Sequence, residues 1–132
     1  MKKMMTSAKV ENLDKVMDFV LKEASDQGFA DLHRVELAVE EIFVNIASYA
    51  YDDTDAEMEV EILCGQTRGF LQIQFFDKGA AFNPLAEAAE PDLLAKDRPI
   101  GGLGVYLVKE CMDEVDYRYE DGKNILTLRK KL

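Results

Sequence analysis

Two stretches in the first half of the chain space their apolar residues three and four apart, as an amphipathic helix does. The first lies between Asn12, a residue type that favours helix starts, and Gly28, a type that commonly ends helices. The second begins after Asp31 and ends at Asp52 and Asp53. Its apolar stripe comprises Val35, Ala38, Val39, Ile42, Phe43, Ile46 and Ala50. The pattern predicts two helices, each with one face in a core.

Four later segments have the residue types and alternation of β-strands. The predicted strands are residues 57–64, 70–77, 115–119 and 124–129. A turn at residues 66–69 would join the first two. The pair Asp121-Gly122, a strong hairpin signal, would join the last two. A further short strand before Asn12 is compatible with the pattern.

Between the two predicted hairpins lie a long irregular segment and a short helix. Residues 80–100 contain all three prolines, together with alanines and acids, which is typical of a loop. Glycines then open a helix at residues 103–112. Because hairpin-linked strands are combined with helices and do not alternate as βαβ units, the order predicts an α+β two-layer sandwich. Its sheet would be mixed but mostly antiparallel, with helices on one face.

Length and charge narrow the range of functions. The 132 residues are the size of one domain, spanning residues 1–132. A net charge of −10 argues against nucleic acid or an anionic membrane as the main partner. No apolar run approaches the ~20 residues needed to cross a bilayer, and the first ten residues lack the apolar core of a secretory signal. We therefore expect a cytoplasmic protein.

Cysteine and histidine are few and dispersed. Cys64 and Cys111 form no Cys-x-x-Cys pair, and His33 has no second ligand nearby in the sequence. In a cytoplasmic protein such cysteines are expected to be reduced, partly buried thiols. We therefore expect no zinc site.

The first candidate motif lies on the second predicted helix, where Glu41 precedes Asn45 by four residues. This spacing puts both side chains on one face of a helix. An amide oxygen is a suitable ligand for Mg²⁺, which keeps waters and takes phosphate oxygens as its other ligands. A carboxylate one turn earlier can accept a proton from a hydroxyl. Taken alone, the pair is a weak signal, because Glu and Asn four residues apart are most often part of a solvated helix face.

The second motif follows the strand at residues 70–77 directly. Asp77 at a strand end can accept a hydrogen bond from an exocyclic amine such as that of adenine. Gly79 lets the backbone approach a flat ring. The alternative is an ordinary Asp-x-Gly turn.

The third motif is the glycine-rich run 101–104, which opens the last predicted helix. Backbone N–H groups at a helix start attract an anion, and the helix dipole adds to the attraction. The spacing matches neither a Walker A loop nor the Gly-x-Gly-x-x-Gly fingerprint. Taken alone, the run could also be a glycine-rich hinge.

The order and spacing of the three motifs resemble the N, G1 and G2 boxes of the histidine-kinase-like (GHKL) ATPases. The resemblance covers nearly the whole chain and is greatest to the anti-sigma factor serine/threonine kinases. It rests on ENLDKVMDFVLKEA, LAVEEIFVNIASYAY and IGGLGVYLVKECMDEVDYRYEDGKNILTLRK. It implies a Bergerat-type ATP-binding fold with an ATP lid at about residues 85–100.

The resemblance also implies roles for the motif residues. Asn45 would coordinate Mg²⁺ with the bound ATP, and Glu41 would be the general base of phosphoryl transfer. Asp77 would bind adenine, with Gly79 beside it.

The remaining implied roles concern the phosphates and the far side of the adenine. Arg98, with Lys96 near it, is placed in the lid where a cation could meet the γ-phosphate, and Thr127 lies near the last family position around the adenine. The backbone around the phosphates would be that of Gly102, Leu103 and Gly104.

The implied function is an ATP-dependent serine/threonine protein kinase in a partner-switching circuit. Its substrate would be a STAS-type anti-anti-sigma protein, a sigma factor could be a second partner, and homologues of this type often form homodimers. Two positions depart from the family, because Tyr49 stands where histidine is common and Asn83 where aspartate is common. The alternative is therefore a non-catalytic ATP-binding module that sequesters its partner.

Overall fold

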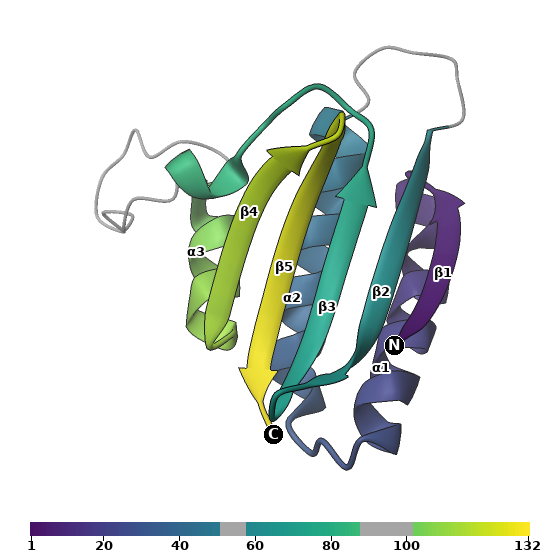
Figure 1. Ribbon diagram of the computed structural model, residues 1–132, viewed down its shortest axis with the longest axis vertical. Coiled ribbons are helices and arrows are strands. Elements are labelled where there is room, and N and C mark those ends of the chain that lie inside the picture. The colour runs from purple at the N-terminus through teal and green to yellow at the C-terminus, as the bar shows by residue number, and fades with distance from the viewer. Residues whose placement is uncertain (51–57, 88–101) are drawn as a thin grey trace.

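Five strands form one sheet in the order β1-β2-β3-β5-β4, and every strand pair that the structure describes is antiparallel (Figure 1). The computed structural model describes residues 1–50, 58–87 and 102–132. The strands are β1 Lys2–Ser7, β2 Glu59–Thr67, β3 Phe70–Asp77, β4 Glu114–Glu120 and β5 Lys123–Lys131. The four strands predicted from alternation and the short N-terminal strand are therefore all present.

The three α-helices of the described residues cover one face of this sheet (Figure 1). They are α1 Leu13–Asp26, α2 Leu32–Asn45 and α3 Gly102–Cys111, and α2 continues as a π-helical segment, Ile46–Ala50. The helices α2 and α3 pack side by side behind β5 and β4 (Figure 1). The predicted α+β two-layer sandwich is therefore confirmed.

The core lies between the two layers. Successive strand residues point to opposite faces of a sheet, so β3 buries Leu71, Ile73 and Phe75 against the helices. The same face of β5 contributes Leu128, whose Cα pairs with that of Ile73. The helices contribute Val16, Val20, Val35, Val39, Ile42 and Phe43, all at most 1% exposed. The apolar stripes of the sequence are thus the helical half of this core.

Tight turns join β2 to β3 and β4 to β5. Arg68 and Gly69 have φ values of 51° and 83°, and Asp121 and Gly122 have 54° and 74°. Two consecutive positive φ values are typical of the type I′ turn, whose twist matches that of the flanking strands. Both hairpin predictions are confirmed. The Asp121-Gly122 turn also fixes the register of β4 on β5, and this register determines which side chains of the two strands lie next to each other.

The helix starts differ from the predicted caps. Asn12 makes no capping hydrogen bond to α1, and its Nδ2 instead donates to the carbonyl oxygen and Oγ of Ser7, at 3.1 and 2.8 Å. Asp31 makes no capping hydrogen bond either, and forms an ion pair with Arg34 at 3.5 Å. Gly28 ends α1 as predicted, with a φ of 80°.

Two other predictions fall largely outside the described residues. Of the expected lid at residues 85–100, only the 3₁₀ turn Pro84–Glu87 is described. The acidic residues expected to end the second helix, Asp52 and Asp53, also lie outside.

Both cysteines are buried and unpaired. Cys64 lies on β2 with no exposed surface, and its burial, with a smaller effect of Glu23, raises the pKa of its thiol to about 12. This thiol stays protonated at neutral pH. Across the described residues, no helix combines the length and apolar character that a membrane crossing requires.

Candidate functional site

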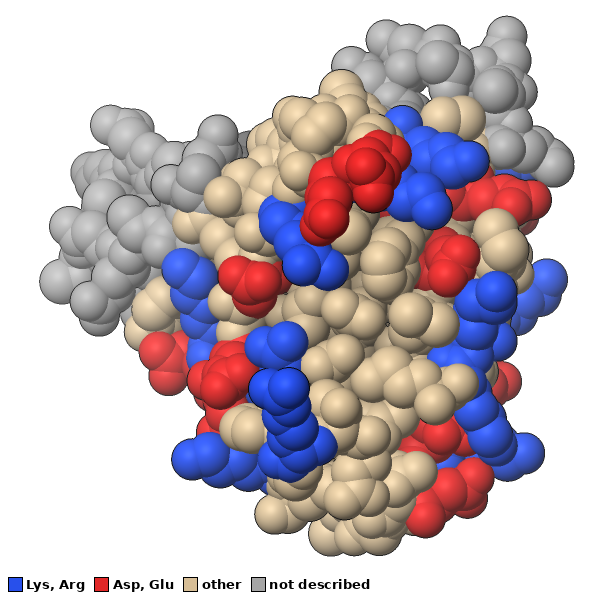
Figure 2. Space-filling view, viewed as in Figure 1, with Lys and Arg blue, Asp and Glu red and all other residues tan. Residues whose placement is uncertain are grey.

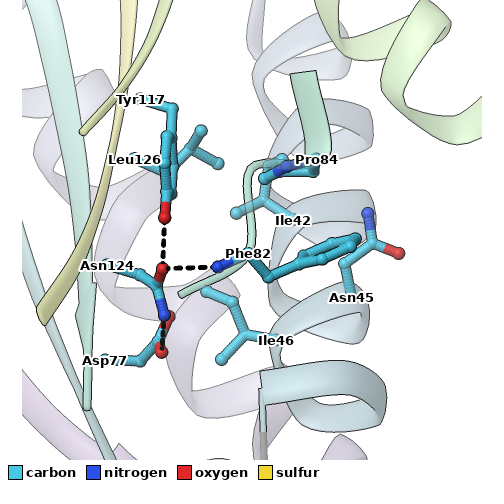
Figure 3. A pocket seen from close by; sticks show the side chains of 9 residues that line it. All are labelled: Ile42, Asn45, Ile46, Asp77, Phe82, Pro84, Tyr117, Asn124 and Leu126. Atoms are coloured by element: carbon cyan, nitrogen blue, oxygen red, sulfur yellow. Dashed lines mark hydrogen bonds between the residues drawn. The ribbon is translucent and has the colours of Figure 1, made fainter. Parts of the chain in front are cut away.

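A pocket lies between the end of α2 and the adjoining ends of β3, β5 and β4 (Figure 3). Its walls are mainly apolar, with a few polar groups pointing inward. It is lined by Ile42, Asn45, Ile46, Asp77, Phe82, Pro84, Tyr117, Asn124 and Leu126. A mainly apolar concavity with a small number of fixed polar groups is the usual form of a small-molecule site.

Asp77 is the buried acid of this pocket. It is the last residue of β3 and is 5% exposed. Its Oδ1 accepts hydrogen bonds from Nδ2 of Asn124 at 2.9 Å and from the backbone N–H of Gly79 at 3.0 Å. Its Oδ2 accepts none from the described residues. The carboxylate therefore has one oxygen fixed by the protein and one available to a ligand.

Burial raises the pKa of Asp77 above its ordinary value, and the hydrogen bonds from Asn124 and Gly79 oppose this rise. A carboxylate out of water loses solvation, while donors to its charged form recover part of that loss. A ligand that donates a hydrogen bond to Oδ2 would stabilise the charged form further. An exocyclic amine is such a donor.

The pocket walls on either side of Asp77 suit a flat apolar ring. Ile42 and Ile46 face it from α2, and Leu126 faces it from β5 (Figure 3). Phe82 and Pro84, from the segment that follows β3, complete the rim.

Asn45 and Glu41 project from neighbouring turns of α2. Asn45 lines the pocket and is half-buried. Glu41 lies one turn earlier, where its carboxylate contacts the backbone of Gly104 in the first turn of α3. A Cβ at position 104 would stand 3.0 Å from Cδ of Glu41 and closer still to its Oε2. The structure thus places the first and third sequence motifs side by side.

The helix α3 begins at Gly102, so the N–H groups of its first turn, including those of Leu103 and Gly104, have no acceptor within the helix. This turn is next to Glu41. The expected anion-binding glycines of α3 therefore lie beside Glu41, which is one turn of α2 away from the pocket-lining Asn45. Arg98 and Lys96, the expected lid cations, lie outside the described residues.

Thr127 requires a correction. Its Cα pairs with that of Gln74, three residues from the Asp77–Asn124 pair, and an odd offset puts it on the opposite face of the sheet from Asp77. Its Oγ1 accepts a hydrogen bond from Nε2 of Gln74 at 3.1 Å there. That face, turned away from the helices, is the one in Figure 2, where charged side chains border a band of uncharged ones. Thr127 therefore does not face the adenine pocket.

Asn124 occupies the place that we expected for Thr127, and the sequence analysis missed it. It is 5% exposed and its side chain points at Asp77 (Figure 3). Tyr117 of β4 was missed as well, and its hydroxyl donates to Oδ1 of Asn124 at 2.5 Å. The sequence did contain a signal for Asn124. Strand residues alternate between faces, so Asn124 shares its face with the apolar core residues Leu126 and Leu128, and a polar residue on a core face indicates a specific role.

Known proteins resemble the chain over most of its length. Residues 6–130 match the family model described as the histidine kinase-like ATPase domain. A serine-protein kinase, RsbW of Bacillus thuringiensis (strain Al Hakam), is 30% identical over 110 residues, which are 78% of this chain and 68% of the relative.

Solved structures show the same fold at lower identity. The RsbU and RsbW domains of a Mycobacterium tuberculosis protein align with a TM-score of 0.64 and 13% identity, over 100% of this chain and 33% of that one. The mycobacterial sensor histidine kinase MprB aligns with a TM-score of 0.57 and 16% identity, over 99% of this chain and 100% of that one. At such identities the likeness shows the fold alone.

Proposed function

Because this chain belongs to the histidine kinase-like ATPase domain family, we propose that it is an ATP-dependent serine/threonine protein kinase of the anti-sigma factor type. One observation carries the proposal: a buried carboxylate with a free oxygen and an amide line one pocket, and a second carboxylate lies one helix turn from that amide, against the start of α3. These groups are those of Asp77, Asn45 and Glu41.

Adenine would bind between the apolar walls and donate from its exocyclic amine to Oδ2 of Asp77. Gly79, whose N–H is bonded to Asp77, shapes the backbone beside the ring. This arrangement favours adenine over guanine, because guanine carries a carbonyl at the position of that amine and would direct an acceptor at a carboxylate.

The phosphates would extend from the pocket toward the start of α3. The N–H groups of Gly102, Leu103 and Gly104 would meet phosphate oxygens, aided by the helix dipole. Asn45 would hold Mg²⁺, which neutralises phosphate charge and takes its other ligands from phosphates and water. Arg98 is proposed for the γ-phosphate on the resemblance alone.

The chemical step would be the transfer of the γ-phosphoryl group to a serine or threonine hydroxyl. The hydroxyl oxygen forms a bond to the γ-phosphorus, the bond from that phosphorus to the β–γ bridging oxygen breaks, and ADP leaves. The hydroxyl proton passes to the carboxylate of Glu41, which is held at the start of α3 beside the expected phosphate groups.

The protein substrate would be a STAS-type anti-anti-sigma domain, with a sigma factor as the competing partner. The support is the 30% identity to a serine-protein kinase named RsbW over 78% of this chain.

The second candidate is an ATP-binding module that holds its partner without phosphorylating it. The observation that favours it is Tyr49 at the end of the Asn45 helix, where histidine is common in the resembling family. Under this proposal the nucleotide pocket is retained and Glu41 has no chemical role.

A labelled-transfer assay tests the proposal. The purified chain would be incubated with Mg²⁺ and γ-³²P-ATP together with STAS-domain proteins encoded in the same genome. We expect label on one of them, and none when its acceptor serine or threonine is replaced by alanine. If the chain binds ATP yet labels none of these proteins while holding one in an ATP-dependent complex, the sequestering module is correct. If it binds no ATP, both proposals fail.

A further inference from the structure

We propose that Asn124 is a positioning residue for adenine recognition, which fixes Asp77 and the segment after β3 through its side-chain amide and makes no contact with the nucleotide. The inference rests on the proposed function, because it assumes that Asp77 reads adenine. It adds two residues, Asn124 and its donor Tyr117, to which neither the sequence motifs nor the resemblance gave a role.

The side-chain amide of Asn124 has no capacity left for a ligand. Its Nδ2 lies 2.9 Å from Oδ1 of Asp77, 3.0 Å from the carbonyl oxygen of Ala80 and 3.3 Å from that of Gly79. Its Oδ1 accepts from the N–H of Phe82 at 3.1 Å and from the hydroxyl of Tyr117 at 2.5 Å. An amide has two N–H donors and two acceptor lone pairs, so all four are used.

These partners also fix which way the amide points. The N–H of Phe82 can only donate, and the carbonyl oxygens of Gly79 and Ala80 can only accept. A flipped amide would set donor against donor and acceptor against acceptor. These backbone partners therefore require the orientation that directs an N–H at Asp77.

The first consequence concerns the carboxylate of Asp77. The bond from Asn124 occupies Oδ1 together with the N–H of Gly79 and leaves Oδ2 to the pocket. The donors also counter the rise in the pKa of Asp77 that burial causes. The groups facing Asp77 from α2 are neutral, namely Ile42, Asn45 and Ile46, and the titratable group on the β4 side is Tyr117. Asn124 is therefore a main support of the charged form.

The second consequence concerns the segment that follows β3. Asn124 bonds to the backbone of three of its residues, Gly79, Ala80 and Phe82. The hydroxyl of Tyr117, on β4, donates a hydrogen bond to the same amide. The rim residues Phe82 and Pro84 belong to this segment, so the rim and the carboxylate are held by one side chain (Figure 3). Loss of the amide should disturb both at once.

The test compares nucleotide binding by two variants and two controls. Asn124→Leu keeps the side-chain size and removes all four hydrogen bonds, and Tyr117→Phe removes one donor only. The matched controls are Thr127→Val, which removes a buried hydroxyl bond from the other face of β5, and Tyr119→Phe, which alters an exposed tyrosine of β4. Calorimetric titration with Mg-ATP and Mg-GTP gives each Kd, and thermal melts show which variants are folded.

We expect the ATP affinity to fall about 10- to 100-fold in Asn124→Leu, the range for hydrogen bonds that involve a charge, and about fivefold in Tyr117→Phe. Binding of GTP should fall less, because the disturbed rim weakens both nucleotides whereas the carboxylate of Asp77 reads adenine alone, so the preference for ATP should decrease. The controls should bind ATP as the unchanged protein does. A purely structural role would weaken both nucleotides equally, and that result would overturn the proposal.

The pH dependence of ATP binding gives a second readout. Binding needs the charged form of Asp77, so affinity falls as the pH drops through the pKa of that carboxyl. Removing the Asn124 donor raises this pKa, so the loss should begin at a higher pH in Asn124→Leu. Unchanged midpoints in both variants, with ATP still bound by the original protein, contradict the inference. Absence of ATP binding in the original protein contradicts the proposed function instead. If Asn124→Leu does not fold, Tyr117→Phe alone decides.

Discussion

The carboxylate of Glu41 on α2 lies against the backbone of Gly104 on α3, where any side chain at position 104 would collide with it. The two residues are 63 positions apart, and α2 and α3 pack against each other at this contact. A glycine at a helix start is usually explained by the close approach that it allows between the backbone N–H groups and a phosphate. Here its missing Cβ also makes room for the proposed base.

We predict that Gly104→Ala displaces Glu41 and lowers phosphate transfer. A misplacement of about 1 Å can reduce an enzymatic rate by up to about 100-fold. Glu41→Asp shortens the side chain by one methylene, so the double variant should transfer faster than Gly104→Ala alone. Transfer to the STAS-type substrate is the measurement, and strictly additive losses would show that the contact does not position Glu41.

A stability measurement checks the same contact without any substrate. Alanine normally stabilises a helix over glycine, by about 0.5–1 kcal/mol. We expect Gly104→Ala to raise the melting temperature less in the original chain, where the carboxylate of Glu41 must move aside, than in a Glu41→Ala background. An equal change in both backgrounds would mean that the two side chains do not interfere.

Local patterns in the sequence were sufficient for the elements of the fold. Gly69 and Gly122 marked hairpins that the structure confirms, and Gly28 marked the end of α1, because each demands a backbone conformation that few other residues adopt. The apolar stripe of α2 identified the core face for the same local reason. These features depend on neighbours in the chain.

The pocket depended on pairings between distant strands, which local patterns do not specify. Asp77 and Asn124 face each other because β3 pairs with β5 in one register, and a shift of one residue would have brought Thr127's face of β5 to the pocket. The resemblance pointed to the correct strand, β5, for the residue beside Asp77, but it selected Thr127, which lies on the other face of that strand. The hydrogen bond from Tyr117 was equally invisible, because it links β4 to Asp77 through Asn124, a residue of a third strand.

We predict that neither cysteine reacts with a thiol reagent in the native protein. Cys64 is fully buried and its thiol has a pKa of about 12, and Cys111 is 8% exposed. The thiolate is the reactive form, and it is scarce where burial raises the pKa. Titration with Ellman's reagent at pH 8 should show negligible reaction in buffer and two thiols in guanidinium chloride. Rapid labelling of Cys64 in buffer would contradict its burial.

We predict that Asp77→Asn stabilises the nucleotide-free protein while weakening ATP. Burial raises the folded-state pKa of Asp77 above its ordinary value, so ionisation of this group opposes folding. Below the ordinary pKa of an aspartate, about 3.9, the acid is neutral in both states and the cost is absent. As the pH rises through the folded-state pKa the cost reaches its full size, so the variant's advantage in melting temperature should grow from acid to neutral pH.

Titration of the same variant with nucleotides gives the other half of this prediction. An amide at position 77 can keep the bonds from Asn124 and Gly79 but turns an N–H toward the adenine amine. We expect Mg-ATP to bind more weakly, by about 1.5–3 kcal/mol for a lost charged hydrogen bond. Guanine nucleotides should lose less. Equal losses for both bases would show that Asp77 does not read adenine.

The final prediction separates the kinase from the sequestering module. Asn45 lines the pocket and would hold Mg²⁺, so Asn45→Ala should impair metal-dependent ATP binding and everything that follows from it. Glu41 would act only when the acceptor hydroxyl loses its proton. Glu41→Gln keeps the side-chain size and removes the basicity, so it should bind Mg-ATP and the partner normally while transfer falls by about 10²–10⁴-fold. Transfer at the original rate by Glu41→Gln would mean that Glu41 is not the base.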